Sequence, residues 1–318
     1  MLRYVLTKLL LTIPLLLGVT FMLFVIGQLT PGDPVLIMLG ERAPADEIVR
    51  LRDALGLDQP WYVQYLQFLG HAAQGDFGIS YRSKLPVIDE VLPRLPATIE
   101  LATAALLFAV LLGLGMGIIS AVKRNTWIDR MAMLVAIVGN SMPVFWSGLL
   151  LIVFFAVDLG WLPASGRGQG EWRNPSDWPT MISHLLMPAI ALGAGAAALI
   201  ARITRSSMLE SLSQDYVRTA RAKGLGEQAV IVQHALRNAL IPVATVVGLQ
   251  TGALMAGAVL TETVFSWPGI GLLTVQAISQ RDFPVLRATV LLVATIFTLI
   301  NLGLDVLFVQ LDPRIKYQ

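Results

Sequence analysis

The sequence predicts an all-α membrane protein, a polytopic bundle of six transmembrane helices. Of its 318 residues, 55% are hydrophobic and only 14% are charged. Soluble domains carry about 25% charged residues, so the deficit indicates a surface that mostly faces lipid. In addition, apolar runs long enough to cross a bilayer, which takes about 20 residues, recur along the chain.

Composition and missing motifs argue against several other classes of protein. The chain has no cysteine, which excludes disulfides, thiolate metal sites and cysteine nucleophiles. The net charge is +2 and no basic stripe interleaved with aromatics is present, which argues against nucleic-acid binding. No Gly-x-x-x-x-Gly-Lys-Ser/Thr loop occurs, and His71, His184 and His234 are too scattered for a zinc site. We therefore expect no catalytic residue, metal or cofactor in this chain.

Six uncharged or nearly uncharged runs are the predicted spans. They cover residues 9–29, 101–122, 131–157, 184–201, 241–261 and 288–311. The first follows Arg3 and Lys8, and its length favours an uncleaved helix over a signal peptide. Pro188 interrupts the fourth run and Asp305 the sixth.

The distribution of basic residues predicts the orientation. Lys and Arg prefer the cytoplasmic side of short loops. They gather before the first span, between the second and third, between the fourth and fifth, and after the sixth. In a six-span arrangement these four segments share one side, whereas acidic residues outnumber basic ones in the segment after the first span. Both termini are therefore predicted to be cytoplasmic.

Small residues inside the spans predict close helix packing. The runs Gly113-x-Gly115-x-Gly117 and Gly193-Ala-Gly195 offer smooth faces on which a neighbouring backbone can approach. Plain packing explains these glycines more simply than a gating role.

The segment from residue 30 to 97 is too long for a plain connector. Asp46 and Glu47 suit the start of a helix that Gly56 ends. A second helix starting at Pro60 places Trp61 and other aromatics on one side, as in helices at a membrane boundary. The segment is either a platform that meets an external protein or a cap over the bundle.

A basic segment between the fourth and fifth spans predicts a helix, a sharp turn and a second helix. Gly224-Leu-Gly226 ends the first helix, because glycine favours the left-handed turn found there. The apolar face of the first helix is predicted to be Leu209, Leu212, Tyr216 and Ala220, and that of the second Leu225, Ala229, Val232, Leu236 and Leu240. Such a shape either presents a rigid knuckle to a partner's groove or lies on lipid headgroups.

The spacing Ala220-x-x-x-Gly224, with Ile241-Pro242 downstream, resembles the EAA loop of ABC importer permeases. Arg218 and Thr219 stand where that family has Glu-Ala, so this chain lacks the glutamate of the family pattern. Six stretches in the same order resemble the branch that imports peptides, glutathione or nickel chelates: residues 29–34, 75–78, 204–208, 215–224, 261–269 and 312–314. The resemblance covers essentially the whole chain and implies the type I, MetI-like permease fold.

The resemblance implies a role, a location and partners. The chain would be the first permease subunit of an inner-membrane importer that moves dipeptides, short oligopeptides or glutathione inward by alternating access. A second permease, two ATPase subunits that hold ATP and Mg, an extracytoplasmic binding protein and lipid would surround it. Coupling to an ATPase would fall on Arg218, Thr219, Ala220, Gly224, Leu225, Glu227 and His234.

The same resemblance suggests an organisation in chain order. Residues 1–97 would hold the first span and the extracytoplasmic loop, residues 98–311 the permease core with its coupling loop at 204–240, and residues 312–318 a tail. Glu262 and Trp267 would lie near the translocation path, although a capped helix end with an interfacial Trp explains them equally well. Asp305 is ionisable within a span, and a structural role is favoured.

An ion-gradient-driven secondary transporter is the alternative function. It requires acidic or histidine side chains near mid-bilayer for ion coupling. Such side chains are almost missing from the predicted spans, which argues against this alternative.

Overall fold

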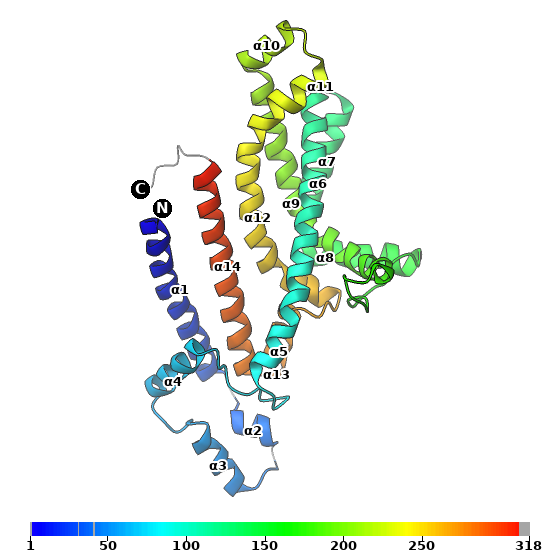
Figure 1. Cartoon of the computed structure of the whole chain (residues 1–318). Coiled ribbons are helices and arrows are strands. Elements are labelled where there is room, and N and C mark those ends of the chain that lie inside the picture. Colours follow the sequence, from blue (N-terminus) through cyan, green and yellow to red (C-terminus); the bar gives the residue numbers. More distant parts are fainter. Residues whose placement is uncertain (1, 31, 41, 312–318) are drawn as a thin grey trace. The chain divides into compact units, whose positions relative to one another are not determined.

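The computed structural model describes residues 2–30, 32–40 and 42–311, and its regular elements are helices (Figure 1). The chain divides into two compact units. Unit 1 comprises Met1–Thr98 and Pro268–Leu302, and unit 2 comprises Ile99–Trp267 and Gly303–Gln318. The predicted tail at 312–318 lies outside the described residues.

Membrane-length helices make up about half of the described chain. Five are long and apolar enough to cross a bilayer: Leu10–Leu29, Val87–Val122, Pro175–Leu212, Glu227–Val264 and Phe283–Leu304. The continuous helix predicted at 131–157 is not found. Instead, Trp127–Ser141 and Val144–Asp158 meet at an angle of 108°, because Met142 and Pro143 are extended and Pro143 caps the second helix. The bundle has six spans when this bent pair counts as one.

Unit 1 joins the first third of the chain to a segment near its end. Its helices are α1 (Leu2–Leu29), α2 (Pro34–Leu39), α3 (Ala45–Ala54), α4 (Trp61–Ala73), α5 (Val87–Val91), α13 (Ile270–Gln280) and the first part of α14 (Phe283–Leu311). The predicted helices near residues 46 and 60 are confirmed. Gly56 has φ +63° just beyond α3, and Pro60 is the N-cap of α4.

The core of unit 1 lies where α5, α13 and α14 meet. Buried Val87 and Val91 of α5 contact Leu273 of α13 and Val285 of α14. The Asp282 carboxylate, which lies just before α14, accepts hydrogen bonds from the Ser80 hydroxyl and from the Tyr81 amide, the latter at 3.2 Å. These contacts fix the loop at residues 76–86 against a segment 200 residues later.

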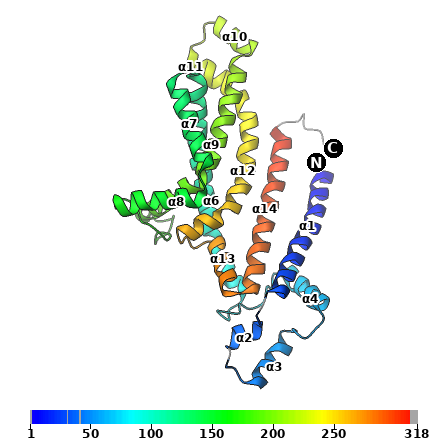
Figure 2. The ribbon, with the colours of Figure 1, turned by 180° about the vertical axis from the view of Figure 1, so that it is seen from behind.

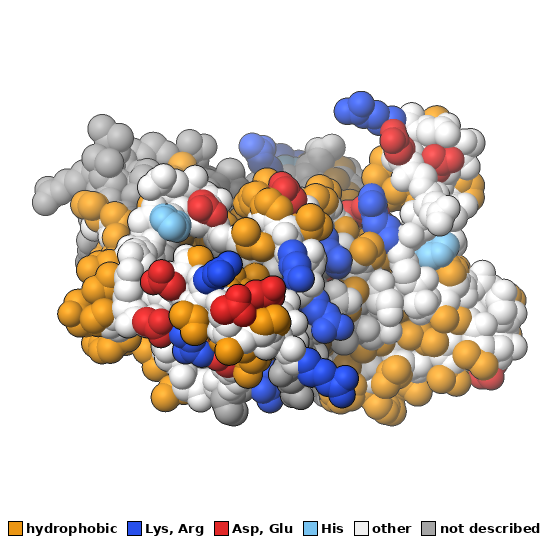
Figure 3. All heavy atoms as spheres, turned by 90° about the horizontal axis from the view of Figure 1, so that it is seen from below, with side chains coloured by type: hydrophobic (Ala, Val, Ile, Leu, Met, Phe, Trp, Pro, Cys, Tyr) orange, Lys and Arg blue, Asp and Glu red, His pale blue; other side chains and the backbone are white. Residues whose placement is uncertain are grey.

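Helix α4 lies against α1 through aromatic side chains (Figure 2). The Tyr65 ring is 5.5 Å from Phe21 and 5.4 Å from Phe24, and the Tyr65 hydroxyl donates to the Leu17 carbonyl at 3.1 Å. Neither α3 nor α4 has a buried residue. On the face drawn in Figure 3, charged side chains of both signs are interspersed with hydrophobic ones. A platform and a cap both remain compatible with this surface.

Unit 2 is organised around one long helix. Its elements are α6 (Leu95–Val122, from residue 99 on), α7 (Trp127–Ser141), α8 (Val144–Leu151) with a π-helical continuation (Ile152–Asp158), α9 (Trp178–Leu212), α10 (Asp215–Ala222), α11 (Glu227–Ala229), a second π-helical segment (Val230–Leu236) and α12 (Arg237–Val264). Helix α9 contacts α7, α8 and α12 and carries buried residues along nearly its whole length. It is therefore the central helix of the unit.

Three of the five predicted packing glycines lie at close approaches between α6 and α9. A Cβ at Gly113 would lie 2.8 Å from a backbone oxygen of α9, and one at Gly117 would lie 2.5 Å from an α9 side chain. A Cβ at Gly193 would lie 2.6 Å from a backbone oxygen of α6. Gly115 and Gly195 have nothing within 4 Å of that position. The predicted close approach is confirmed for Gly113, Gly117 and Gly193.

Candidate functional site: an exposed knuckle

The predicted helix–turn–helix is present as α10, a glycine turn and α11, which we call the knuckle (residues 215–229). Gly224 has φ +79°, the left-handed conformation that favours glycine. The Gly224 amide donates to the Arg221 carbonyl at 2.9 Å and the Leu225 amide to the Ala220 carbonyl at 3.4 Å. The helix therefore ends as predicted. Gly226 has φ −62°, so its backbone is open to any residue.

The knuckle has a buried side and an exposed side. Val217 and Ala220 are buried against Val230. Arg218, Thr219, Gly224, Leu225 and Glu227, all predicted coupling residues, are exposed. Ala220 thus anchors the knuckle from within, and His234 is half-buried farther along.

An ion pair crosses the glycine turn. The Arg221 guanidinium donates from Nη2 to Glu227 Oε1 at 2.6 Å and from Nε to Oε2 at 3.1 Å. The hydrogen bonds to the Glu227 carboxylate raise the pKa of Arg221 above its usual value. Both side chains are largely exposed, and such pairs contribute little stability. Their geometric effect is to tie α10 to α11.

The predicted apolar face of the second helix is wrong in part, since only Ala229 and Leu236 of its five residues are half-buried. The chain buries Val230, Ala235 and Ala239, whereas Leu225, Val232 and Leu240 are exposed. Residues 230–236 form a π-helix, whose wider turn shifts the buried face by one position relative to an ordinary helix.

The predicted face of the first helix is wrong in part. A break at Ser213 and Gln214 starts a new helix at Asp215, so that Val217 is buried and Tyr216 is exposed. Ala220 is buried as predicted.

Below the knuckle, α6, α7 and α9 meet at a buried ion pair. The Arg205 guanidinium donates from Nε to Asp129 Oδ1 at 2.7 Å and from Nη2 to Oδ2 at 2.8 Å. The same carboxylate accepts from the Ser120 hydroxyl and from the Asn125 amide, the latter at 2.9 Å. Asp129 is 4% exposed. We call this ion pair with Ser120 the base node.

Sequence reasoning missed the base node. It counted Arg205 among the basic residues that indicate orientation and within the resembling stretch 204–208, but gave it no acidic partner. Asp129 is the lone acid among Lys123, Arg124 and Arg130, and that isolation was the available signal. A second contact supports the same region: Ala121 and Met208 pack with Ala235 and Ala239 of the segment that leads out of the knuckle. Two basic segments therefore meet at one end of unit 2 (Figure 1).

Glu262 and Trp267 lie at the opposite end of α12. Both are fully buried, and the Trp267 amide donates to the Glu262 carbonyl at 2.8 Å across a turn in which Ser266 has φ +49°. The buried indole does not fit the interfacial alternative. Proximity to a translocation path stays a prediction, and the side chain of Asp305 lies outside the described part of the chain.

Metal ligation has no support in the ranges that the structure describes. No group of three or more His, Cys, Asp or Glu side chains there could hold a metal ion. The geometry of the knuckle instead offers an exposed, rigidly held protein surface.

Membrane-length helices, a central helix with glycine contacts and an exposed knuckle define a polytopic membrane protein. Residues 113–317 match the family described as the binding-protein-dependent transport system inner membrane component, and residues 1–102 match its N-terminal family. The chain belongs to this family, as the sequence resemblance predicted.

Curated relatives match over the full length of both chains. The chain is 49% identical to the dipeptide transport system permease protein DppB of Alkalihalophilus pseudofirmus and 44% identical to DppB of Escherichia coli K12. It is 46% identical to the glutathione transport system permease protein GsiC of Salmonella typhimurium.

Solved structures show the same fold at low identity. An inward-facing MetNI methionine ABC transporter matches with a TM-score of 0.58 at 18% identity, covering 71% of this chain and 97% of that one. An amino acid ABC transporter matches with a TM-score of 0.50 at 15% identity, covering 70% and 93%. The predicted MetI-like fold is confirmed. Family membership also confirms that the chain is a multi-pass inner-membrane component of a transport system, rather than an enzyme.

Proposed function

We propose that this chain is a permease subunit of an ATP-driven importer that moves dipeptides or short peptides such as glutathione inward. The knuckle is the observation that carries the proposal. It exposes Arg218 and Thr219 on α10 and Leu225 on the turn that Gly224 forms. The names of the full-length relatives support peptide or glutathione as the cargo.

The proposal includes partners that this chain does not supply. Two ATPase subunits, carrying ATP and Mg, would grip the outer side of this knuckle and of its counterpart on a second permease related by a pseudo-two-fold axis. A soluble binding protein would deliver the peptide at the extracytoplasmic side. Both relatives and solved neighbours are transport-system permeases or ABC transporters by name, which supports this assembly.

The contacts of the knuckle suggest how force would pass into the membrane. Its inner side is packed on Val230, and the helix that contains Val230 continues into α12 without a break. The helix before the knuckle is α9, and the base node connects α9 to α6 and α7. Pulling on the knuckle would therefore move two spans together, and closure of the ATPases would rock the bundle between inward-facing and outward-facing states.

Replacing Gly224 tests this proposal. A Gly224→Val substitution forces a β-branched residue into a left-handed conformation and distorts the turn. We expect the reconstituted importer to lose ATPase stimulation and dipeptide uptake by about tenfold or more, while the chain still inserts. Gly226→Ala, at φ −62° and with nothing within 4 Å of the new Cβ, is the matched control and stays near wild type.

Two outcomes count against the proposal. Unchanged uptake in Gly224→Val would remove the knuckle from coupling. Uptake into proteoliposomes that follows an imposed ion gradient, with no need for internal ATP, would favour the secondary transporter.

A further inference from the structure

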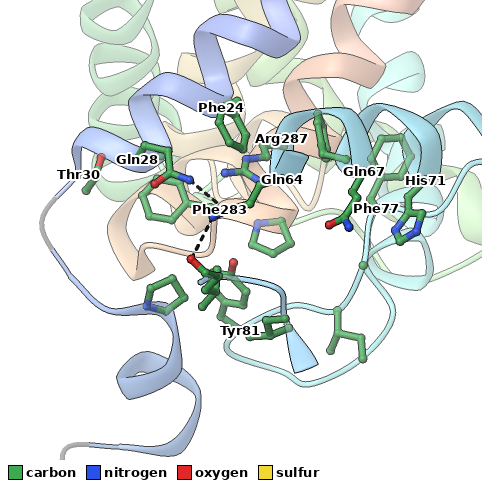
Figure 4. Close-up of a pocket in the computed structure, with 18 of the residues that line it drawn as sticks. Phe24, Gln28, Thr30, Gln64, Gln67, His71, Phe77, Tyr81, Phe283 and Arg287 are labelled. Carbon is green, nitrogen blue, oxygen red and sulfur yellow. Dashed lines mark hydrogen bonds between the residues drawn. The ribbon is translucent and has the colours of Figure 1, made fainter. Parts of the chain in front are cut away.

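A second candidate site lies within unit 1. A cavity of about 510 Å³ opens between the end of α1, helix α4, the loop at residues 76–81 and the start of α14 (Figure 4). Its lining includes the cation Arg287 together with Gln67 and Tyr81.

The Arg287 guanidinium lies over two phenyl rings. Its Cζ lies 5.2 Å from the centre of the Phe24 ring and 5.3 Å from that of Phe68. The faces of aromatic rings attract a cation, but they supply no hydrogen-bond acceptor or counter-charge. Nε of Arg287 is buried and has no hydrogen-bond partner among the residues described.

The carboxylates around this cavity are already engaged. Asp33 accepts from Arg52 and, at 3.0 Å, from the Val35 amide. Asp76 accepts from the Gly78 amide at 2.8 Å. Within the part of the chain that the structure describes, no carboxylate lies within 4 Å of the Arg287 guanidinium. A largely buried cation without a counter-ion is unfavourable, so the site favours an anion.

Neutral donors lie beside the cation. Burial raises the pKa of the Tyr81 hydroxyl, although the positive charge of Arg287 opposes the rise. Tyr81 therefore stays protonated at neutral pH and is able to donate. The Gln67 side chain also lines the cavity (Figure 4). Within the described ranges, neither side chain makes a hydrogen bond to the rest of the protein.

We propose that this cavity binds an oxyanion, a carboxylate or phosphate group, with Arg287 as its charge partner and Tyr81 and Gln67 as further donors. The planar guanidinium fork matches both groups and binds them through two parallel hydrogen bonds. Two sources share this chemistry: a small carboxylate in solution and the phosphate of an anionic lipid headgroup. The lipid is a source because Phe24 and Arg287 lie near the ends of two membrane-length helices.

Glycines on α1 provide matched variants. A Cβ at Gly27 would lie 2.8 Å from Nη2 of Arg287, so Gly27→Ala displaces the mobile end of that side chain and keeps its charge. Gly18, on the same helix, has nothing within 4 Å of a new Cβ, so Gly18→Ala is the control. Arg287→Gln removes the charge, and Arg287→Lys keeps the charge without the fork.

The test measures binding to the full chain in its purified complex, held in phosphatidylcholine nanodiscs. One arm titrates N-acetylglycine against N-acetylglycinamide, which lacks the carboxylate, by calorimetry. The other arm adds phosphatidylglycerol to the nanodiscs and counts retained lipids by native mass spectrometry. We expect one of the two anions to bind, and Arg287→Gln and Gly27→Ala to weaken it by about tenfold or more, with Gly18→Ala unchanged.

The arms separate the two sources, and the outcomes decide the proposal. Binding of N-acetylglycine identifies a soluble carboxylate, and retention of phosphatidylglycerol identifies a lipid headgroup. If wild type binds neither anion, or if Gly27→Ala and Gly18→Ala bind equally, there is no such site. Gly27→Ala decides the matter if Arg287→Gln does not fold. The readout is binding, so it is independent of whether the complex transports peptides.

Discussion

Two ion pairs at the same end of unit 2 share a chemistry and differ in setting. Arg205–Asp129 and Arg221–Glu227 both join an arginine fork to a carboxylate, with shortest distances of 2.7 Å and 2.6 Å. In the first pair the side chains are 27% and 6% exposed, and in the second 43% and 58%. The residues of the first pair are 76 positions apart in the sequence and those of the second are six apart.

The two pairs therefore serve different purposes: the base node holds helices together, and the pair in the knuckle lies on an accessible surface. The buried pair, with Ser120 and the Asn125 amide, holds three helices in one arrangement. The exposed pair shapes one turn and leaves its atoms accessible to a partner. The proposed coupling role requires both properties, because a knuckle on a loosely held base would move without moving the membrane-length helices.

Breaking the base node should have the largest effect on stability. Asp129→Asn leaves Arg205 partly buried without its counter-charge. We expect a loss of roughly 2–3 kcal/mol, somewhat below the cost of breaking a fully buried pair, because Arg205 keeps some exposure. Thermal unfolding of the purified complex in detergent should show a clearly lower Tm.

A double variant sharpens this test. Asp129→Leu with Arg205→Met replaces both charges by apolar groups and should recover much of the lost stability. An Asp129→Asn protein as stable as wild type would show that the pair does not hold the base.

The glycine contacts beside the base node predict the next largest effect. Gly117→Ala puts a methyl group 2.5 Å from Thr204 on α9 and forces α6 and α9 apart. Overpacking of this kind costs about 1–3 kcal/mol. Gly115→Ala, two residues away with nothing within 4 Å, should leave the Tm at its wild-type value or raise it. Equal Tm values for the two variants would contradict the close approach of the helices.

The knuckle was easier to predict from the sequence than the base node. Gly224 has a local signature, since a glycine after a basic helix predicts a left-handed turn, and Pro60 and Gly56 marked α4 and α3 in the same way. Asp129 and Arg205 are joined only by folding, and a single sequence does not show which distant charges meet.

Other errors arose where regular geometry was assumed. A window of hydropathy is the same for a straight helix and for one bent by 108° at Pro143. A period of 3.6 residues assigns the wrong face where residues 230–236 form a π-helix. The cavity around Arg287 was also beyond sequence reasoning, because it combines α1, α4 and α14 from the two ends of the chain.

The smallest effect on stability is expected in the knuckle, where a variant should change the geometry of the turn without changing the Tm. Arg221→Gln removes the bond across the turn, and the Tm should stay within about 1 °C of wild type because the pair is exposed. The Leu225 amide, which donates over a long 3.4 Å bond to the Ala220 carbonyl, should exchange with solvent several-fold faster.

Arg218→Gln is the control for that variant. Arg218 pairs with Asp215 within α10 at 3.6 Å, so its loss removes another exposed ion pair without touching the turn. Exchange at Leu225 should then stay at the wild-type rate. Because salt screens exposed pairs, raising the ionic strength should bring the wild-type rate toward that of Arg221→Gln, while the stability gap of Asp129→Asn persists. If Arg218→Gln and Arg221→Gln accelerated exchange equally, the Arg221–Glu227 ion pair would have no effect of its own on the turn. Gly224 alone would then set the geometry of the turn between α10 and α11.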